Sequence, residues 1–553
     1  MSMAALAVMS VWNSRADDPV RIQVDAAGNG GPMKPVWAYV GYDEPNFTYM
    51  KDGTKLLTEL SELSYVPVYV RTHNLLTSGD GTAALKWGST NAYTEDEKGN
   101  PVYDWTIMDR IFDTYVDRGM KPLVEIGFMP EALSTQPEPY QHSWAPSHQS
   151  NIFTGWTFPP TDYDKWRELV CQWVKHCVDR YGEKEVLTWY WEVWNEPDIG
   201  YWSGTHEEYC KLYDYAADGV KKALPGALVG GPATTDPSGA NAYEYLTKFL
   251  EHCQNGTNYA TGRKGAPLDL ITFHAKGSPR VVDGHVRMNL GRQLKNIERG
   301  FEAVCSFPKF KDLPIFITES DPEGCAACSV RYSPQNAYRN GTMYSSYTAA
   351  AYARTYELAQ KYGVNLVGSM SWAFEFEDQE WFAGFRDMAT NGVDKPVLNT
   401  LRMLGQMKGN FLPVNASRHI SLESIVAESV RGEEDLNAMA ARSDHSITVM
   451  VWNYHDDDED APATDVDLLI DNIGHDRVFV EHFRIDENFS NSYEAWKSLG
   501  SPQSPTPEQY EVLEKSGRLQ LCRPAYWTGT DDGSLSFQFP LSRQGISLIK
   551  LTW

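Results

Sequence analysis

The sequence has little positive charge and no long hydrophobic run. Its 553 residues include 49 Lys and Arg against 74 Asp and Glu, which gives a formal net charge of −25. A field of that sign repels phosphate backbones and anionic membrane surfaces. No apolar run approaches the ~20 residues that a membrane-spanning helix needs. We therefore expect neither nucleic acid nor a membrane as a partner, and a neutral substrate is the simpler expectation.

Cysteine is also scarce, because eight cysteines in a chain of this length are too few for a disulfide-stapled scaffold. Cys325 and Cys328 form one CxxC motif, without the second pair or the histidine pair that would complete a zinc site. They are interpreted as a loop disulfide or as free thiols, and no metal or cofactor is expected. The acidic run at residues 456–460 is interpreted as a solvated turn, with calcium binding as the alternative.

The first residues resemble a signal peptide. The apolar stretch at residues 3–12 is followed by Ser14, Arg15 and Ala16, which place small residues at positions −3 and −1 of a cleavage site. The basic segment that usually precedes the apolar stretch is missing. Residues 1–16 are predicted to be a signal-peptide remnant, which indicates a secreted or periplasmic protein, with a cytoplasmic location as the alternative.

Short β-branched or aromatic runs alternate with longer amphipathic stretches, such as residues 165–181, over most of the chain. This pattern is typical of repeated βα units with a parallel sheet. Eight units predict an α/β fold, a (β/α)₈ TIM barrel at residues 27–408. The strand-like runs lie at residues 35–41, 66–73, 121–128, 188–197, 227–233, 269–276, 313–320 and 366–374.

After about residue 410 the pattern changes to strand-like alternation without a helix pattern of comparable length. We expect an accessory β-sandwich built from residues 17–26 and 409–553, to which residues 20–24 would add a strand. The other predicted strands lie at residues 446–455, 466–473, 477–485 and 545–553.

Two glutamates follow strands of the predicted barrel. Glu196 ends the fourth strand and Glu319 the seventh, so both should face the bowl at the carboxyl ends of the strands. Retaining glycoside hydrolysis needs such a pair, one acid and one nucleophile about 5–5.5 Å apart. Glu196 lies in the segment Trp194-Asn195-Glu196-Pro197, and Asn-Glu-Pro at this place marks a large clan of retaining glycosidases. Glu196 is therefore the expected acid/base, with a raised pKa, and Asn195 the expected partner of the substrate 2-hydroxyl.

Several further segments have the form of motifs from one known family. They are Arg71-Thr72-His73, residues 128–133, residues 251–262 with residues 273–277, Glu319-Ser320-Asp321-Pro322, and residues 395–398. Through these segments the chain resembles glycoside hydrolase family 39, the family of β-xylosidases and α-L-iduronidases, over most of its length. The resemblance implies that Glu319 is the nucleophile, and that His73 and His274 line the subsite of the cleaved sugar. Trp372 would be a stacking platform for that sugar or part of the barrel core.

Substrate choice depends on two positions. Lys276 could bind the carboxylate of a uronic acid or pair with Glu319 or Asp321. Iduronidases also carry an arginine where this chain has Asp394, which would repel an anionic sugar. The sequence thus predicts an exo-acting β-xylosidase that releases terminal xylose from xylo-oligosaccharides or xylosides. The alternatives are an α-L-iduronidase-like or arabinose-releasing enzyme and a catalytically inactive carbohydrate-binding protein. A homo-oligomer is compatible with the sequence.

Overall fold

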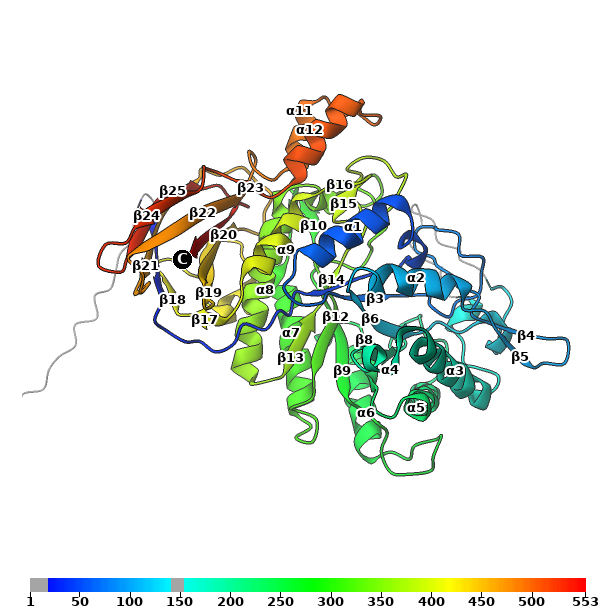
Figure 1. Cartoon of the computed structure of the whole chain (residues 1–553). Helices are drawn as coiled ribbons and strands as arrows, with labels where there is room; N and C mark the ends of the chain where they lie inside the picture. The colour runs from blue at the N-terminus through cyan, green and yellow to red at the C-terminus, as the bar shows by residue number, and fades with distance from the viewer. Residues whose placement is uncertain (1–17, 141–153) are drawn as a thin grey trace, which may run out of the picture.

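The computed structural model describes residues 18–140 and 154–553, and it contains a parallel barrel (Figure 1). Seven strands pair in chain order, and the eighth is split into two pieces that pair with the last and the first of them, which closes the barrel. All eight predicted strands are confirmed. They are β2 (Tyr39–Tyr42), β3 (Tyr69–Thr72), β6 (Lys121–Ile126), β7 (Tyr190–Val193), β8 (Leu228–Thr234), β9 (Leu270–Lys276), β12 (Ile315–Asp321), and β13 (Leu366–Ser369) with β14 (Ser371–Trp372).

Helices cover the outside of the barrel. The helix predicted at residues 165–181 is α3, whose Asp162 side chain caps its first turn. Helix α8 is buried on most of its surface because it lies between the barrel and the second unit. The helices are α1 (Lys51–Glu62), α2 (Thr106–Val116), α3 (Tyr163–Tyr181), α4 (Glu183–Val186), α5 (His206–Ala223), α6 (Ala240–Asn255), α7 (Leu290–Cys305), α8 (Thr342–Tyr362) and α9 (Pro396–Gln406). No helix within the described ranges is long and apolar enough to cross a bilayer.

The second unit is a sandwich of two sheets that bury a shared apolar core. The smaller sheet contains β18 (Val414–Ala416), β1 (Val20–Asp25), β21 (Thr464–Asp471) and β25 (Leu535–Leu541), in that order. β1 therefore lies inside this sheet, although the barrel separates it from its neighbours in sequence. The larger sheet contains β17 (Asn410–Leu412), β19 (Asp435–Arg442), β20 (Ser446–Tyr454), β26 (Ile546–Thr552), β22 (Arg477–Ile485), β23 (Gln520–Leu521) and β24 (Tyr526–Gly529).

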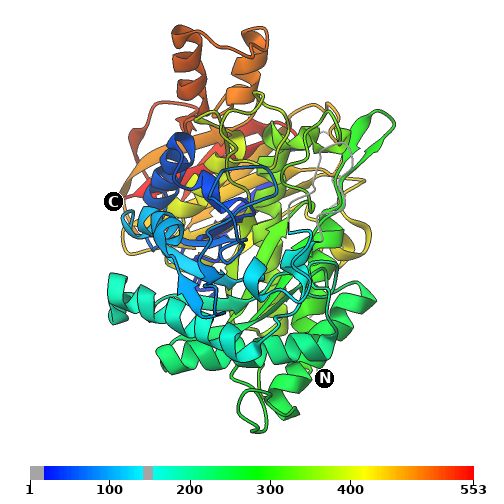
Figure 2. The same cartoon turned by 90° about the vertical axis from the view of Figure 1, so that its right-hand side faces the viewer.

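A helical hairpin interrupts the second unit, where no helix pattern comparable in length to those of the barrel was expected. It consists of α11 (Ser492–Ser498) and α12 (Pro507–Gly517) and projects from the body of the molecule (Figure 1, Figure 2). A shorter helix, α10 (Leu422–Glu428), also lies in this part of the chain. The hairpin packs against Trp381 and Phe382 in the long loop that follows the eighth barrel strand. The second unit thus supports a loop of the barrel.

The acidic run at residues 456–460 is only partly a solvated turn. Asp456 and Asp457 are buried, whereas residues 458–460 are exposed. Asp457 forms an ion pair with Arg287 and a hydrogen bond with His285, whose Nε2 lies 2.8 Å from its Oδ1. Both partners belong to β11 (His285–Arg287), a strand in the loop after β9. The run therefore joins the two units, because its buried charge needs a partner of opposite charge.

A buried ion pair also joins the two units and gives a stability prediction. Arg354 of α8 lies 2.6 Å from Asp435 of β19, which also accepts a hydrogen bond from Trp452. Asp435→Ala removes the negative partner of the buried guanidinium. We therefore expect the free energy of unfolding to fall by about 3 kcal/mol, measured by denaturant titration. Glu357→Ala is the matched control, because Glu357 pairs with the same arginine from a half-exposed position and should cost below about 1 kcal/mol. Equal losses in both variants would contradict this account.

Candidate active site

The carboxyl ends of the barrel strands bring the two predicted glutamates together. Glu319 lies on β12, and Glu196 follows β7 by three residues. One carboxylate oxygen of each, together with a ring nitrogen of His274 on β9, lie within 4.8 Å of one another. Both glutamates, which are separated by more than a hundred residues in the chain, therefore face the same small volume.

The turn that carries Glu196 has an unusual backbone. Trp194 and Glu196 both have positive φ, at 76° and 44°, a region that residues other than glycine rarely adopt. Hydrogen bonds hold this turn: the Glu196 N–H donates to the carbonyl of Ala233 at 2.8 Å, and the Trp194 indole donates to that of Tyr201 at 3.0 Å. Such local strain is tolerated where the surrounding structure fixes it, and here it accompanies a site residue.

Two cations and a histidine surround the carboxylate of Glu319. Its Oε2 lies 2.6 Å from Lys276 Nζ, and its Oε1 lies 3.1 Å from His73 Nε2 and 3.4 Å from Arg71 Nη1. Burial alone would raise the pKa of Glu319, but the charge of Lys276, followed by the contacts with the imidazoles of His274 and His73, holds it well below its ordinary value. Glu319 is therefore ionised at neutral pH.

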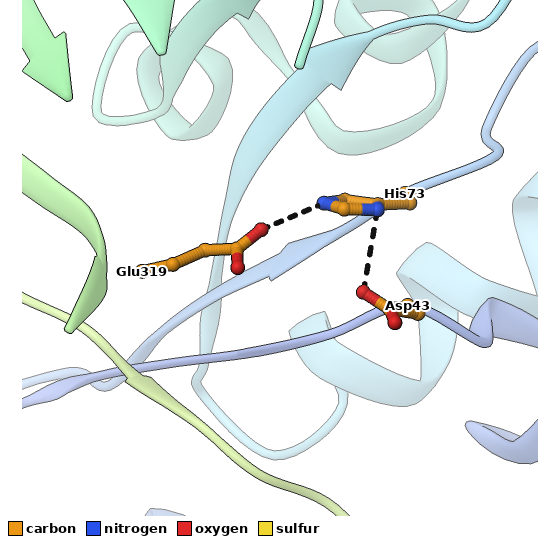
Figure 3. Close-up of side chains that lie close together, drawn as sticks. All are labelled: Asp43, His73 and Glu319. Atoms are coloured by element: carbon orange, nitrogen blue, oxygen red, sulfur yellow. Dashed lines mark hydrogen bonds and ion pairs between the residues drawn. The ribbon is translucent and has the colours of Figure 1, made fainter. Parts of the chain in front are cut away.

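His73 bridges Glu319 and Asp43, as Figure 3 shows. Its Nδ1 lies 3.3 Å from Asp43 Oδ1, opposite the contact to Glu319. Asp43 also accepts a hydrogen bond from the Trp372 indole at 2.9 Å and pairs with Lys86. Burial lowers the pKa of His73, which favours its neutral form. The ring is thus fixed from both sides, and its orientation depends on Asp43.

Glu196 is protonated at neutral pH, whereas Glu319 is ionised. Burial, with the charge of Glu319 as the next cause, raises the pKa of Glu196 to about 8. Its Oε1 lies 2.8 Å from Nδ1 of His274, and burial lowers the pKa of that histidine to about 4. At neutral pH the site therefore contains a protonated carboxyl beside an ionised one, with a neutral imidazole between them.

The side-chain amide of Asn195 is hydrogen-bonded through its oxygen, whereas its nitrogen is available to a ligand. Its Oδ1 accepts a hydrogen bond from Arg71 Nη2 at 3.0 Å. Its buried Nδ2 makes no hydrogen bond within the part of the chain that the structure describes. A buried donor without a partner is costly, and a ligand oxygen would satisfy it.

Trp372 is fully buried at the end of the eighth strand. The Arg71 guanidinium carbon lies 4.9 Å from its ring centroid, and a side chain at position 41 would collide with the ring, with a Cβ only 2.2 Å away. Glycine is required there for this close approach. These contacts, together with the bond to Asp43, give Trp372 a role in orienting the site, and its stacking on a sugar stays a prediction.

Several charged residues of the site were not expected from the sequence. Arg71, which was noted only as part of a motif, lies 2.5 Å from Glu192 and 2.9 Å from Glu125. A signal for these two glutamates exists, because each is a lone carboxylate inside an apolar strand and must be paired when buried. Arg386 was also not expected, and it forms an ion pair with Asp321, which the sequence named as an alternative partner of Lys276.

The two cysteines of the CxxC motif form a disulfide, with Cα atoms 5.5 Å apart. The sequence left a disulfide and free thiols open, and the structure has the disulfide. The loop that it closes begins four residues after β12, the strand that carries Glu319 and Asp321.

Two groups of side chains are spaced closely enough to hold a metal ion, namely Asp43, His73 and Glu319, and Glu196, His274 and Glu319. Glu319 belongs to both and already pairs with Lys276 and Arg71. Protein cations therefore supply the positive charge that an ion would bring, and we assign no metal to either group.

Asp394 does not face the site as its place in the sequence suggested. Its carboxylate lies 2.8 Å from Arg402 of α9 and also interacts with Glu59 of α1. Both partners lie on the outer helices, so Asp394 does not oppose an anionic sugar. That argument from the sequence is wrong, because a residue's place along a loop does not fix where its side chain points.

A closed parallel barrel with facing carboxylates at its strand ends is the architecture of a barrel glycosidase. The model of the family described as glycosyl hydrolases family 39 matches residues 20–528. A β-xylosidase from Geobacillus stearothermophilus is 27% identical over 509 residues, 87% of this chain and 86% of that protein. An α-L-iduronidase from Mus musculus is 24% identical over 538 residues, 90% of this chain and 76% of that protein.

The structure of a monomeric β-xylosidase from Caulobacter crescentus CB15 shares the fold, with a TM-score of 0.73 at 22% identity, covering 96% of this chain and 99% of that one. The chain therefore belongs to glycosyl hydrolase family 39 and is a glycosidase, and the resemblance seen in its motifs is confirmed.

Proposed function

We propose that the protein is a retaining, exo-acting β-xylosidase that releases terminal xylose from xylo-oligosaccharides or xylosides. The observation that carries the mechanism is the opposite protonation of Glu196 and Glu319, whose nearest site oxygens lie within 4.8 Å. This spacing suits direct attack by one carboxylate, whereas an inverting enzyme leaves about 6.5–9.5 Å for a water molecule.

In the first step, the Glu319 carboxylate attacks the anomeric carbon while the Glu196 carboxyl gives its proton to the departing glycosidic oxygen. The product is a glycosyl ester of Glu319, and Glu196 is left ionised. Water then attacks the anomeric carbon of this ester and gives a proton to Glu196, which releases the sugar and restores the Glu319 carboxylate and the Glu196 carboxyl. The anomeric configuration is retained because it is inverted twice.

The neighbours of the two glutamates have matching roles in this proposal. Lys276 and His73 keep Glu319 ionised and oriented. The unpaired Asn195 amide donates to the sugar 2-hydroxyl, a contact that strengthens in the transition state. Neutral His274 orients Glu196 without taking its proton at neutral pH.

A neutral pentose is supported by the charges around Lys276. Its ammonium contacts both Glu319 and Asp321, so a uronate carboxylate would have to compete with two carboxylates of the protein. The β-xylosidase relative is also matched over more of its own length than the iduronidase. Lys276 itself keeps an α-L-iduronidase-like specificity, or an arabinose-releasing one, as the second candidate. The secreted or periplasmic location rests on residues 1–16, which lie outside the described residues.

A panel of aryl glycosides tests the substrate. We expect kcat/KM for aryl β-xyloside to exceed that for aryl α-L-iduronide and aryl α-L-arabinoside by about tenfold or more, because even a methylene-sized mismatch in a pocket is worth about 10–200-fold, and an added carboxylate or a different arrangement of hydroxyls is a larger mismatch. Glu319→Ala purified in parallel is the control for contaminating enzymes. Faster turnover of the iduronide would reverse the assignment, and tight xylose binding without any turnover would favour a carbohydrate-binding protein.

A further inference from the structure

The nucleophile candidate shares its lysine with a second carboxylate. Asp321 lies two residues after Glu319 on β12, so the two side chains are on the same face of the strand. Both contact Nζ of Lys276, at 2.6 Å in the case of Glu319. Two buried carboxylates therefore compete for one ammonium, and their mutual repulsion would favour protonation of one of them.

Arg386 supplies the missing positive charge. Its Nη1 forms an ion pair with Asp321 and donates to the carbonyl of Glu323. The side chain is fully buried, whereas its Nε and Nη2 make no hydrogen bond within the described residues. Burial opposes its charge, but Asp321, with a smaller contribution from Glu319, raises the pKa of Arg386. The guanidinium is thus a fixed cation on the far side of Asp321 from Lys276.

The disulfide loop holds Arg386 in place. The backbone N–H of Arg386 donates at 2.9 Å to the carbonyl of Ala326, which lies between the two cysteines. The buried guanidinium of Arg339 donates to the carbonyls of Cys325 and Cys328 at 2.8 and 3.2 Å. This loop gives the CxxC motif a structural purpose, because it positions the segment that carries Arg386.

We propose that Arg386 is a positioning residue that neutralises Asp321, so that the charge of Lys276 is left to keep Glu319 ionised and reactive. The proposal rests on the proposed function, since it assigns Arg386 to the nucleophile of that reaction. The charged and titratable groups that face Glu319 are Arg71 of β3 and His73 after it, Glu125 of β6, His274 and Lys276 of β9, Glu196 and Tyr201 after β7, Asp43 after β2, Asp321 on its own strand, and Arg386.

The test is the pH dependence of kcat/KM in Arg386→Gln, measured with the aryl glycoside that wild type hydrolyses best. The uncompensated Asp321 charge should raise the pKa of Glu319, so the acid limb should move up by about one pH unit. Activity below that limb should fall about tenfold, because one pH unit changes the ionised fraction tenfold. Arg386→Lys keeps the charge and should keep the limb near that of wild type.

The double variant R386Q/D321N separates charge from structure. Removing both charges should return the acid limb to near the wild-type pH, whereas a merely structural arginine would give a double variant at least as impaired as R386Q. Asp321→Asn alone should move the limb to lower pH, which keeps the test available if R386Q does not fold. A higher KM in R386Q with an unchanged limb would mean that Arg386 binds substrate, and would overturn the proposal.

A covalent label distinguishes this inference from the proposed function. Wild type treated with a 2-deoxy-2-fluoro aryl glycoside should accumulate a glycosyl ester on Glu319, identified by peptide mass spectrometry. A label on another residue would overturn the proposed function. A label on Glu319 together with an unmoved acid limb in R386Q would overturn only the role of Arg386.

Discussion

Glu319→Ala is expected to lower kcat for an aryl β-xyloside by at least about 10⁴-fold, the scale of loss seen when a nucleophile is removed. The variant retains Glu196 and can still protonate the leaving group, but nothing attacks the anomeric carbon. Lys276, Arg71 and His73 would then face a space without their carboxylate. Steady-state assays on purified protein measure the loss.

Azide should restore part of that activity, because the vacated space is small and lined by positive groups that attract an anion. Attack from that side inverts the anomeric carbon once, so the product should be an α-xylosyl azide, identified by NMR. Glu319→Gln is the matched control: its amide fills the space, so this variant should be inactive and should not respond to azide. Undiminished turnover in Glu319→Ala, or a β-configured azide, would show that Glu319 is not the nucleophile.

The eight barrel strands could be predicted because a parallel strand buried on both faces is a nearly continuous apolar run. The ends of those runs then indicated Glu196 and Glu319, since the fold places strand ends at one face. The cations that set their protonation were harder to find. Lys276 ends a strand, but Arg386 comes from an irregular loop whose path depends on Arg339 and on the Cys325–Cys328 bond.

The helical hairpin and two aspartates differed from expectation. Thr506 and Gln509 form a capping box at the start of α12, a local signal that the surrounding strand pattern hid. Asp394 and Asp457 are acidic loop residues that the sequence suggested would face a ligand or solvent. Asp457 is instead buried against Arg287 from a distant segment, and Asp394 against Arg402 in the helix that follows it, so neither carboxylate faces a ligand or solvent.

Glu196→Ala should separate the two chemical steps. For an aryl xyloside with a poor leaving group, we expect kcat/KM to fall about 10³-fold, because general acid catalysis contributes about 10²–10⁴-fold. For a dinitrophenyl xyloside, whose leaving group needs little protonation, kcat/KM should change far less, while kcat falls because water loses its general base. The two substrates measured side by side are the test, and an equal loss of kcat/KM on both would contradict an acid role.

The pH dependence of kcat/KM also tests the role of Glu196 as the acid. Glu196 must be protonated to act first, and burial and the charge of Glu319 raise its pKa to about 8. Wild-type kcat/KM should therefore be unaffected by this group below that pH and decline as the pH rises through about 8. In Glu196→Ala that basic limb should disappear, while the acid limb set by Glu319 remains. A basic limb that persists in the variant would assign it to another group and leave Glu196 without its role.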